Sequence, residues 1–146
     1  MIYREEAKNL MNVPQGYWIA HCISGDFALG AGVAKQIDLT FNMRDMLNRL
    51  WGKSSPMSGQ WSAPCCLPCG NVFNLVTKER YFHKPTLNTL RTALEEMCKY
   101  AVKMGVTKIA MPKIGCGLDR LDWDDVSPMI QEVFENTDIE ILVCVL

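Results

Sequence analysis

The sequence predicts a layered α/β fold with a largely parallel, buried sheet, and two observations lead to this prediction. Short apolar runs that are typical of buried strands alternate with segments whose apolar residues recur at helical spacing. Alternating strands and helices form parallel sheets that helices cover on both faces. The chain has 146 residues, 49% of them hydrophobic, which suits one domain with a buried core. We therefore expect residues 1–146 to form a single domain.

The first half of the chain contains one predicted strand that leads into helices. Residues 17–24, "YWIAHCIS", follow a Pro-Gln-Gly turn and form an apolar run that predicts a buried strand. A glycine-rich loop begins at Gly25 and opens into a helix, and helical spacing continues over residues 42–51. Residues 52–64 are rich in Gly, Ser and Pro and predict a loop.

The clearest helix lies in the second half, between a strand at residues 71–77 and a strand at residues 106–111. Its apolar residues recur at spacings of three, four and seven. Pro85 and Thr86 mark its start, and Gly105 stands where a glycine commonly ends a helix.

A last helix and strand complete the predicted fold. The helix is indicated by one apolar face, made of Trp123, Val126, Ile130, Val133 and Phe134. We expect its regular part to begin at Ser127-Pro128, because an interior proline removes a backbone hydrogen bond. The final strand is predicted at residues 141–145.

The net charge and the lack of a targeting signal in the sequence argue against several classes of protein. The formal net charge is −1, without the basic stripe of a general nucleic-acid-binding protein, although recognition of a nucleic-acid end stays open. The N-terminus is too polar for a signal peptide, and no apolar run is long enough to span a membrane. We expect a cytoplasmic, intracellular monomer without membrane contact.

The seven cysteines are expected to be reduced thiols in such a compartment. Cys66 and Cys69 form a CxxC, but no second CxxC or CxxH follows at the spacing of a zinc site. We therefore predict no metal and no cofactor. The role of Cys65, Cys66 and Cys69 is left open.

Two glycine loops indicate the functional edge of the domain. The first contains Gly30 and Gly32 before a predicted helix, and the second contains Gly115 and Gly117 after a predicted strand. Ligands of parallel α/β sheets bind at the C-terminal ends of the strands, where both loops fall. Backbone N–H groups at a helix start bind anions, so two facing loops can hold two linked phosphates. Each loop taken alone can equally be an ordinary tight turn.

Five segments of the sequence together resemble a known family. They are, in order, "AHCIS", "LGAGVA", "TKER", "HKPT" and "MPKIGCGLDRLDW". Their order and spacing resemble the macrodomain family, and within it the terminal ADP-ribose protein glycohydrolase branch. The resemblance runs from about Asn9 to Leu146, and Thr77-Lys78 and residues 115–120 are its most specific parts. It implies a three-layer α/β/α macrodomain with a mixed, largely parallel central sheet.

The resemblance also implies a ligand, ADP-ribose, and the residues that bind it. The two phosphates are expected against the two glycine loops, and the adenine near the N-terminal segment. The implied binding residues are Asn9, Leu10, Ser24, Gly30, Ala31, Gly32, Val33, Lys113, Ile114, Gly115, Cys116, Gly117, Leu118 and Leu146. Asn9 stands where the family usually has an Asp; it keeps a carbonyl acceptor for the adenine amino group and loses the charge.

The branch implies that Lys78 and Asp119 carry the chemistry. The expected reaction removes ADP-ribose from modified Glu or Asp side chains, and the same cleft can deacylate O-acyl-ADP-ribose. A neutral lysine amine can attack the ribose carbon, and an aspartate can act as base. A neighbouring carboxylate also tends to hold the lysine charged, and the sequence leaves the balance open. Asp119 has an alternative role as a helix cap, for which Asp122 and Asp124 compete.

The expected partners are ADP-ribosylated proteins, and two alternative functions remain. One is a module that binds ADP-ribose without turning it over, which would not need Lys78 and Asp119. The other is a hydrolase that acts on ADP-ribosylated nucleic acid with the same residues.

Overall fold

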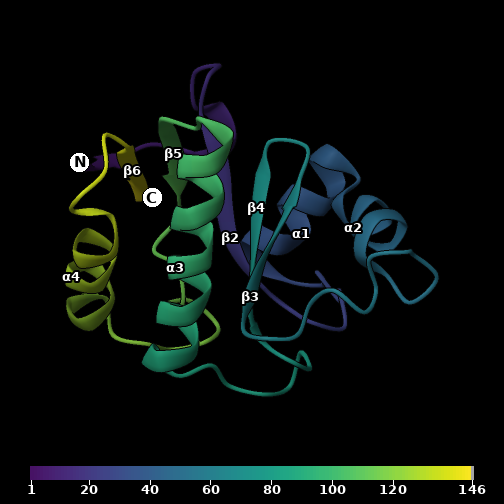
Figure 1. The fold of residues 1–146 in the computed structure, drawn as a ribbon. Coiled ribbons are helices and arrows are strands. Elements are labelled where there is room, and N and C mark those ends of the chain that lie inside the picture. The colour runs from purple at the N-terminus through teal and green to yellow at the C-terminus, as the bar shows by residue number, and fades with distance from the viewer. Residues whose placement is uncertain (146) are drawn as a thin grey trace.

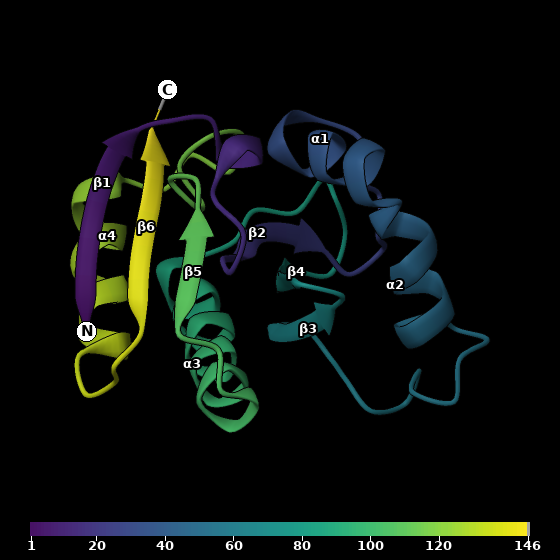
Figure 2. The ribbon, with the colours of Figure 1, turned by 90° about the horizontal axis from the view of Figure 1, so that it is seen from above.

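The computed structural model describes residues 1–145, whose six strands form one sheet (Figures 1 and 2). The strands are β1 (Ile2–Ala7), β2 (Trp18–Ser24), β3 (Cys65–Cys69), β4 (Val72–Lys78), β5 (Lys108–Met111) and β6 (Glu140–Val145). Their order in the sheet is β1-β6-β5-β2-β4-β3. Neighbouring strands are parallel except β3 and β4, which are antiparallel. The predicted mixed, largely parallel sheet is confirmed.

Helices cover both faces of this sheet. One apolar cluster joins the sheet to α1 (Gly32–Phe41), α2 (Met43–Trp51) and the short helix η1 (Leu10–Asn12). The other cluster joins it to α3 (Leu87–Met104) and α4 (Trp123–Phe134), which stand next to each other in Figure 1. Two clusters on opposite faces give the expected three-layer α/β/α arrangement.

The start and the end of α3 follow the sequence prediction. Thr86 and Thr89 cap the first turn reciprocally, since the Thr86 hydroxyl accepts from the Thr89 N–H at 3.1 Å and the Thr89 hydroxyl accepts from the Thr86 N–H at 2.9 Å. Gly105 ends the helix with a φ of 71°, a left-handed conformation that glycine adopts without strain.

The start of α4 differs from the prediction. The helix begins at Trp123, because the Asp122 side chain caps it by accepting from the Asp124 N–H at 2.9 Å. Pro128 therefore lies inside the helix, and the expected start at Ser127-Pro128 is wrong. An interior proline removes one hydrogen bond of the helix, but this helix buries an apolar face that favours its full length.

Two strands were not predicted, and both lie at the edges of the sheet. The residues of β1 are mostly exposed, so the strand lacks the apolar run of a buried one. β3 contains Pro68, which is tolerated at an edge because the missing N–H faces no neighbouring strand. Cys65, Cys66 and Cys69 are buried free thiols on this strand.

Parallel pairing brings four strand ends to one edge of the molecule. The C-terminal ends of β1, β2, β4 and β5 lie at the same edge, so the segments that follow them meet there. Both glycine loops and Lys78 fall at this edge, as predicted. Among the helices of residues 1–145, none is both long and apolar enough to cross a membrane.

Candidate active site

Lys78 and Asp119 meet at the C-terminal edge of the sheet. Lys78 is the last residue of β4, and Asp119 lies in the loop that follows β5. The Lys78 Nζ donates to Asp119 Oδ1 at 2.6 Å, and the two side chains are only 14% and 15% exposed. The fold thus forms one close, largely shielded ion pair from the two residues that the sequence singled out.

A β-bulge between β2 and β4 directly precedes Lys78. Ile23 stands opposite Val76, whereas the next residue, Ser24, stands opposite Lys78, which leaves Thr77 unpaired. Bulges of this kind turn the side chains that follow them and occur beside functional sites. The Gly25 N–H donates to the Lys78 carbonyl at 2.8 Å and holds the end of the strand.

The first glycine loop leaves backbone N–H groups free at the start of α1. Ala31 is the N-cap and its side chain accepts no hydrogen bond. Within the described chain, the N–H groups of Gly32, Val33 and Ala34 have no acceptor. Gly30, Ala31 and Gly32 are exposed. A helix start with open N–H groups and a positive dipole end is suited to an anion such as phosphate.

The two glycines of the second loop serve different purposes. Gly115 is buried at a φ of 75°, and an added Cβ would stand 3.0 Å from Leu121 Cδ1 and 3.2 Å from Leu90 Cδ2. It is therefore required by packing. A Cβ on Gly117 would meet nothing within 4 Å. Gly117 thus leaves open space at the surface of the loop, as a backbone that receives a ligand must.

The second loop faces the first across the site. The Leu118 side chain comes within 3.8 Å of the position that a Cβ would take on Gly32. Lys113 at the start of this loop lies over the Trp123 ring, 5.9 Å from its centre. Ile114 is buried, whereas Gly117 and Leu118 are exposed toward solvent.

Asp26 is a functional candidate that the sequence did not single out. Its Oδ1 accepts from the Ser24 hydroxyl at 2.5 Å and from the Ala28 N–H at 3.2 Å, and its Oδ2 accepts from the Tyr81 N–H at 2.9 Å. Burial raises the pKa of this carboxyl, but these hydrogen bonds outweigh burial and hold its pKa below the ordinary value. One ionised side chain thus ties the first glycine loop to the loop after Lys78. The only sequence signal is an Asp after a strand.

Two cysteines near the pair are neutral thiols. Burial, and then the charge of Asp119, raise the pKa of Cys22 to about 12. Burial also raises the pKa of Cys116, whose thiol contacts the Ile114 carbonyl at 3.4 Å. A thiol that stays protonated is a poor nucleophile, so Cys116 acts as a small filler of the loop.

Asn9 and Leu10 follow β1 at the same edge of the sheet. Asn9 is exposed and caps η1, since its Oδ1 accepts from the Met11 N–H at 2.9 Å. One of the two acceptor positions of its carbonyl is therefore already used. Leu10 is 6% exposed and belongs to the core. Leu146, the remaining expected contact, lies outside the described residues.

The competing role for Asp119, as a helix cap, falls to Asp122. Asp122 caps α4, and Asp119 precedes it by three residues and contacts Lys78 instead.

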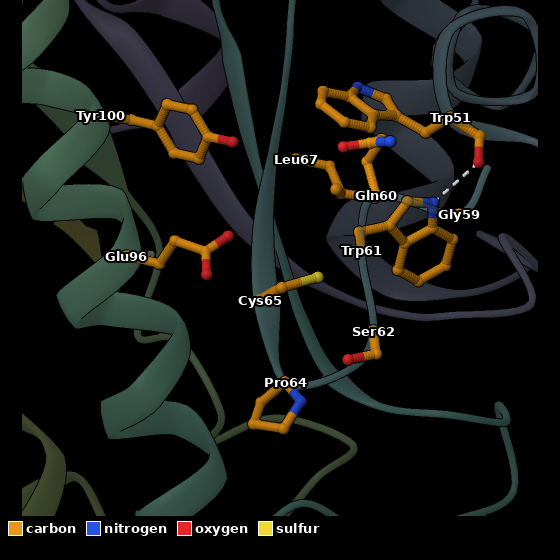
Figure 3. Close-up of a pocket in the computed structure, with 10 residues that line it drawn as sticks. All are labelled: Trp51, Gly59, Gln60, Trp61, Ser62, Pro64, Cys65, Leu67, Glu96 and Tyr100. Carbon is orange, nitrogen blue, oxygen red and sulfur yellow. Dashed lines mark hydrogen bonds between the residues drawn. The ribbon is translucent and has the colours of Figure 1, made fainter. Parts of the chain in front are cut away.

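A separate cavity of about 450 Å³ lies beside edge strand β3 (Figure 3). It is lined by Trp51, Gly59, Gln60, Trp61, Ser62, Pro64, Cys65, Leu67, Glu96 and Tyr100. Trp61 donates its indole N–H to the Trp51 carbonyl at 2.8 Å, and Glu96 accepts the Cys66 N–H at 2.9 Å. Burial raises the pKa of Cys65 to about 12. The indole and carboxylate contacts thus stabilise the sheet edge, and the Cys65 thiol stays protonated.

Among residues 1–145, no three His, Cys, Asp or Glu side chains lie close enough to hold a metal ion. Of the two histidines, His21 is buried and its Nε2 contacts Asn74 Oδ1 at 2.6 Å. His83 is exposed, in the loop after Lys78.

Comparison with known proteins identifies similar sequences and folds. The sequence profile of the Macro domain matches residues 65–130. The chain is 43% identical to the ADP-ribose glycohydrolase OARD1 of Homo sapiens over 136 residues, which cover 92% of this chain and 86% of that protein.

Two solved structures share the fold at low sequence identity. The macrodomain of Thermus aquaticus DarG superposes with a TM-score of 0.82 at 23% identity, covering 98% of this chain and 97% of that chain. Thermosipho africanus DarTG, solved in complex with ADP-ribose, superposes with a TM-score of 0.64 at 14% identity, covering 90% of this chain and 39% of that chain.

Proposed function

The chain belongs to the macro domain family, and from this premise we propose that it is an ADP-ribose glycohydrolase that removes ADP-ribose from modified proteins. Its similarity to OARD1 over nearly its whole length supports this activity. The observation that carries the proposal is the 2.6 Å contact between Lys78 and Asp119, at the edge where the two glycine loops face each other. A module that only binds ADP-ribose has no need of a shielded lysine–aspartate pair.

In the proposed complex, the diphosphate lies between the two loops. The open N–H groups at the start of α1 bind one phosphate, and the backbone around Gly117 approaches the other. The adenine lies toward Asn9 and Leu10, and the distal ribose lies beside Lys78 and Asp119. The substrate bond is the ester between the ribose carbon C1″ and a Glu or Asp side chain.

The first chemical step transfers the ADP-ribosyl group to Lys78. A proton passes from Nζ to Asp119 along their hydrogen bond, which leaves a neutral amine beside a neutral acid. The Nζ lone pair attacks C1″, and the bond from C1″ to the carboxylate oxygen breaks. Asp119 returns its proton to the departing carboxylate. The products are a carboxylic acid and an ADP-ribosyl group bound to Nζ, and Asp119 is again ionised.

The second step releases ADP-ribose. Asp119 takes a proton from a water molecule, whose oxygen attacks C1″ while the bond between C1″ and Nζ breaks. The lysine leaves as a neutral amine and recovers the proton from Asp119, which restores the ion pair. In O-acyl-ADP-ribose the ester stands on a neighbouring ribose hydroxyl, where Asp119 can activate water in the same way.

The wild-type protein tests this function directly. We expect purified protein to release free ADP-ribose from a protein modified on glutamate, and to bind ADP-ribose in calorimetry. Binding without release would identify a reader module. Release from an ADP-ribosylated oligonucleotide in preference to the modified protein would change the substrate class and keep the fold and residues.

A further inference from the structure

Residues 80–83 form a hydrogen-bonded turn that begins two residues after the catalytic candidate Lys78. The His83 N–H donates to the Arg80 carbonyl at 3.0 Å, and the Arg80 N–H donates to His83 Nδ1 at 3.3 Å. The backbone and the imidazole thus both close the turn, and Tyr81 and Phe82 are its two central residues.

These two central residues expose large apolar side chains. Tyr81 is 67% exposed and Phe82 is 66% exposed. Turn centres usually carry Gly, Pro, Asn, Asp or Ser, which suit the backbone, so turn geometry does not explain two aromatic residues here. Large exposed apolar side chains that lie together are typical of a binding surface.

Contacts from both sides place this turn beside the lysine–aspartate pair. Asp26 accepts the Tyr81 N–H at 2.9 Å, and Lys84 Nζ donates to the Leu118 carbonyl at 3.1 Å. Leu118 is itself 67% exposed and directly precedes Asp119. The exposed apolar side chains thus follow one member of the pair and precede the other.

We propose that Tyr81, Phe82 and Leu118 form an acceptor patch that binds the polypeptide segment carrying the modified acidic side chain. The inference rests on the proposed function. In that reaction the carboxylate departs from C1″ beside Lys78 and Asp119, so the polypeptide that carries it must cross the surface around the pair. The acceptor patch is the apolar part of that surface.

The charge around the acceptor patch selects an acidic segment. Arg80, Lys84 and Arg120 are exposed in the two loops that carry the patch. The exposed carboxylates beside them, Glu79 and Asp122, are fewer, and an excess of cations attracts polypeptides in which Glu or Asp residues cluster. This complements a substrate whose modified residue is itself acidic.

The ring geometry favours a polypeptide over a nucleic acid. The Tyr81 and Phe82 rings meet edge to face at 87°, and the Phe82 and His83 rings at 69°. Binding of single strands uses open ring faces on which successive bases stack, together with a basic groove. These rings pack against each other instead, and the net charge of the chain is −1.

The test compares two esters that share the reacting bond at C1″ and differ in the leaving group. One is an acidic peptide that carries ADP-ribose on glutamate, and the other is the C1″ ester of ADP-ribose with acetic acid, which is too small to reach the patch. The double variant Tyr81→Ala with Phe82→Ala is assayed beside wild type and beside Leu39→Ala, which removes a side chain that is 76% exposed on α1.

We expect the double variant to lose about tenfold in kcat/KM on the peptide and to stay within twofold of wild type on the acetic ester. Leu39→Ala should match wild type on both. Equal losses on both esters, or none, would overturn the acceptor patch while the hydrolase function stands. A larger loss on an ADP-ribosylated single-stranded oligonucleotide than on the peptide would also overturn it, by assigning the surface to nucleic acid. A wild-type protein that cleaves none of these substrates would refute the hydrolase function itself.

Discussion

The Lys78 ammonium lies 2.6 Å from the Asp119 carboxylate, although 41 residues separate them in the chain. One comes from the end of β4 and the other from the loop after β5, so only the folded sheet brings them together. The contact also bears on how Lys78 could lose its proton. In the proposed mechanism, Lys78 attacks only after it has lost a proton, and Asp119 lies close enough to accept that proton.

We expect Asp119→Asn to slow both chemical steps and to trap the enzyme between them. The second step depends on a base for water, which an amide cannot be, so an ADP-ribosyl adduct should accumulate on Lys78. Intact-protein mass spectrometry after mixing with substrate measures the adduct. Turnover should fall by about 10²–10⁴-fold.

The matched control for this experiment is Asp122→Asn. Asparagine caps a helix about as well as aspartate, so this variant should keep α4, full turnover and an unmodified lysine. An Asp119→Asn protein with wild-type turnover would contradict the role of Asp119 as base.

Substitution by alanine should reduce stability at Gly115 and reduce ADP-ribose binding at Gly117. Gly115→Ala places a methyl group against Leu121 and Leu90 at a positive φ, and should reduce the free energy of unfolding by about 1–3 kcal/mol. Gly117→Ala meets open space and should leave stability unchanged, but weaken ADP-ribose binding by roughly tenfold or more, because the new methyl group stands where the ligand approaches. Urea denaturation and calorimetry measure the two effects. A stable Gly117→Ala variant with unaltered affinity would place the diphosphate elsewhere.

The sequence predicted the parts of the fold whose signals are local. The helix from Leu87 to Met104 has periodic apolar residues and a cap at each end, and both ends are where the sequence placed them. The edge strands lack such a signal for different reasons: β1 is mostly exposed and carries few apolar residues, whereas β3 is buried but contains Pro68, which argues against a strand in the sequence. The predicted start of α4 was wrong because burial of the apolar face of the helix outweighs the hydrogen bond that an interior Pro128 removes.

The site shows a similar division. The two glycine loops predicted the edge of the sheet at which the site lies. The family resemblance implied Lys78 and Asp119, and the fold brings these two residues together. The bulge at Thr77 depends on the register between β2 and β4, which the sequence does not show. The hydrogen bonds of Asp26 to Ser24 and Tyr81 join two loops that meet only in the folded chain. Packing requires a glycine at position 115 because Leu90 and Leu121 lie against it. Only the folded chain brings these two leucines to Gly115.

His21 should make the fold less stable as the pH falls. Burial lowers the pKa of His21 from 6.5 to about 4, although the hydrogen bond to Asn74 opposes this shift. The unfolded chain then binds more protons than the folded chain between these values. The contribution of this pKa difference to the free energy of unfolding is complete above pH 6.5 and is lost progressively as the pH falls toward 4.

Urea denaturation at pH 7.5 and pH 5 measures this loss in wild type and in His21→Gln, which cannot titrate. We expect wild type to lose about 2 kcal/mol more than the variant between the two values of pH. Equal losses in both proteins would show that His21 is not the source.

Thr77→Val should leave the fold as stable or make it more stable. Within the described residues the buried Thr77 hydroxyl has no hydrogen-bond partner, and valine replaces it with a methyl group of similar size. Removing an unsatisfied buried hydroxyl can add up to about 1 kcal/mol to the free energy of unfolding. Thermal denaturation measures the change, and a clear loss of stability would mean that the hydroxyl is satisfied by a bound water.

The most direct test of the proposed catalysis is the rate of ADP-ribose release from a glutamate-linked ester by wild type and by Lys78→Arg, with ADP-ribose affinity measured on the same samples. Arginine keeps a cation for Asp119 but does not become a neutral nucleophile. We expect release to fall on the order of a thousandfold or more, while the dissociation constant of ADP-ribose changes by no more than about fivefold. Release by Lys78→Arg at the wild-type rate would contradict nucleophilic catalysis by Lys78.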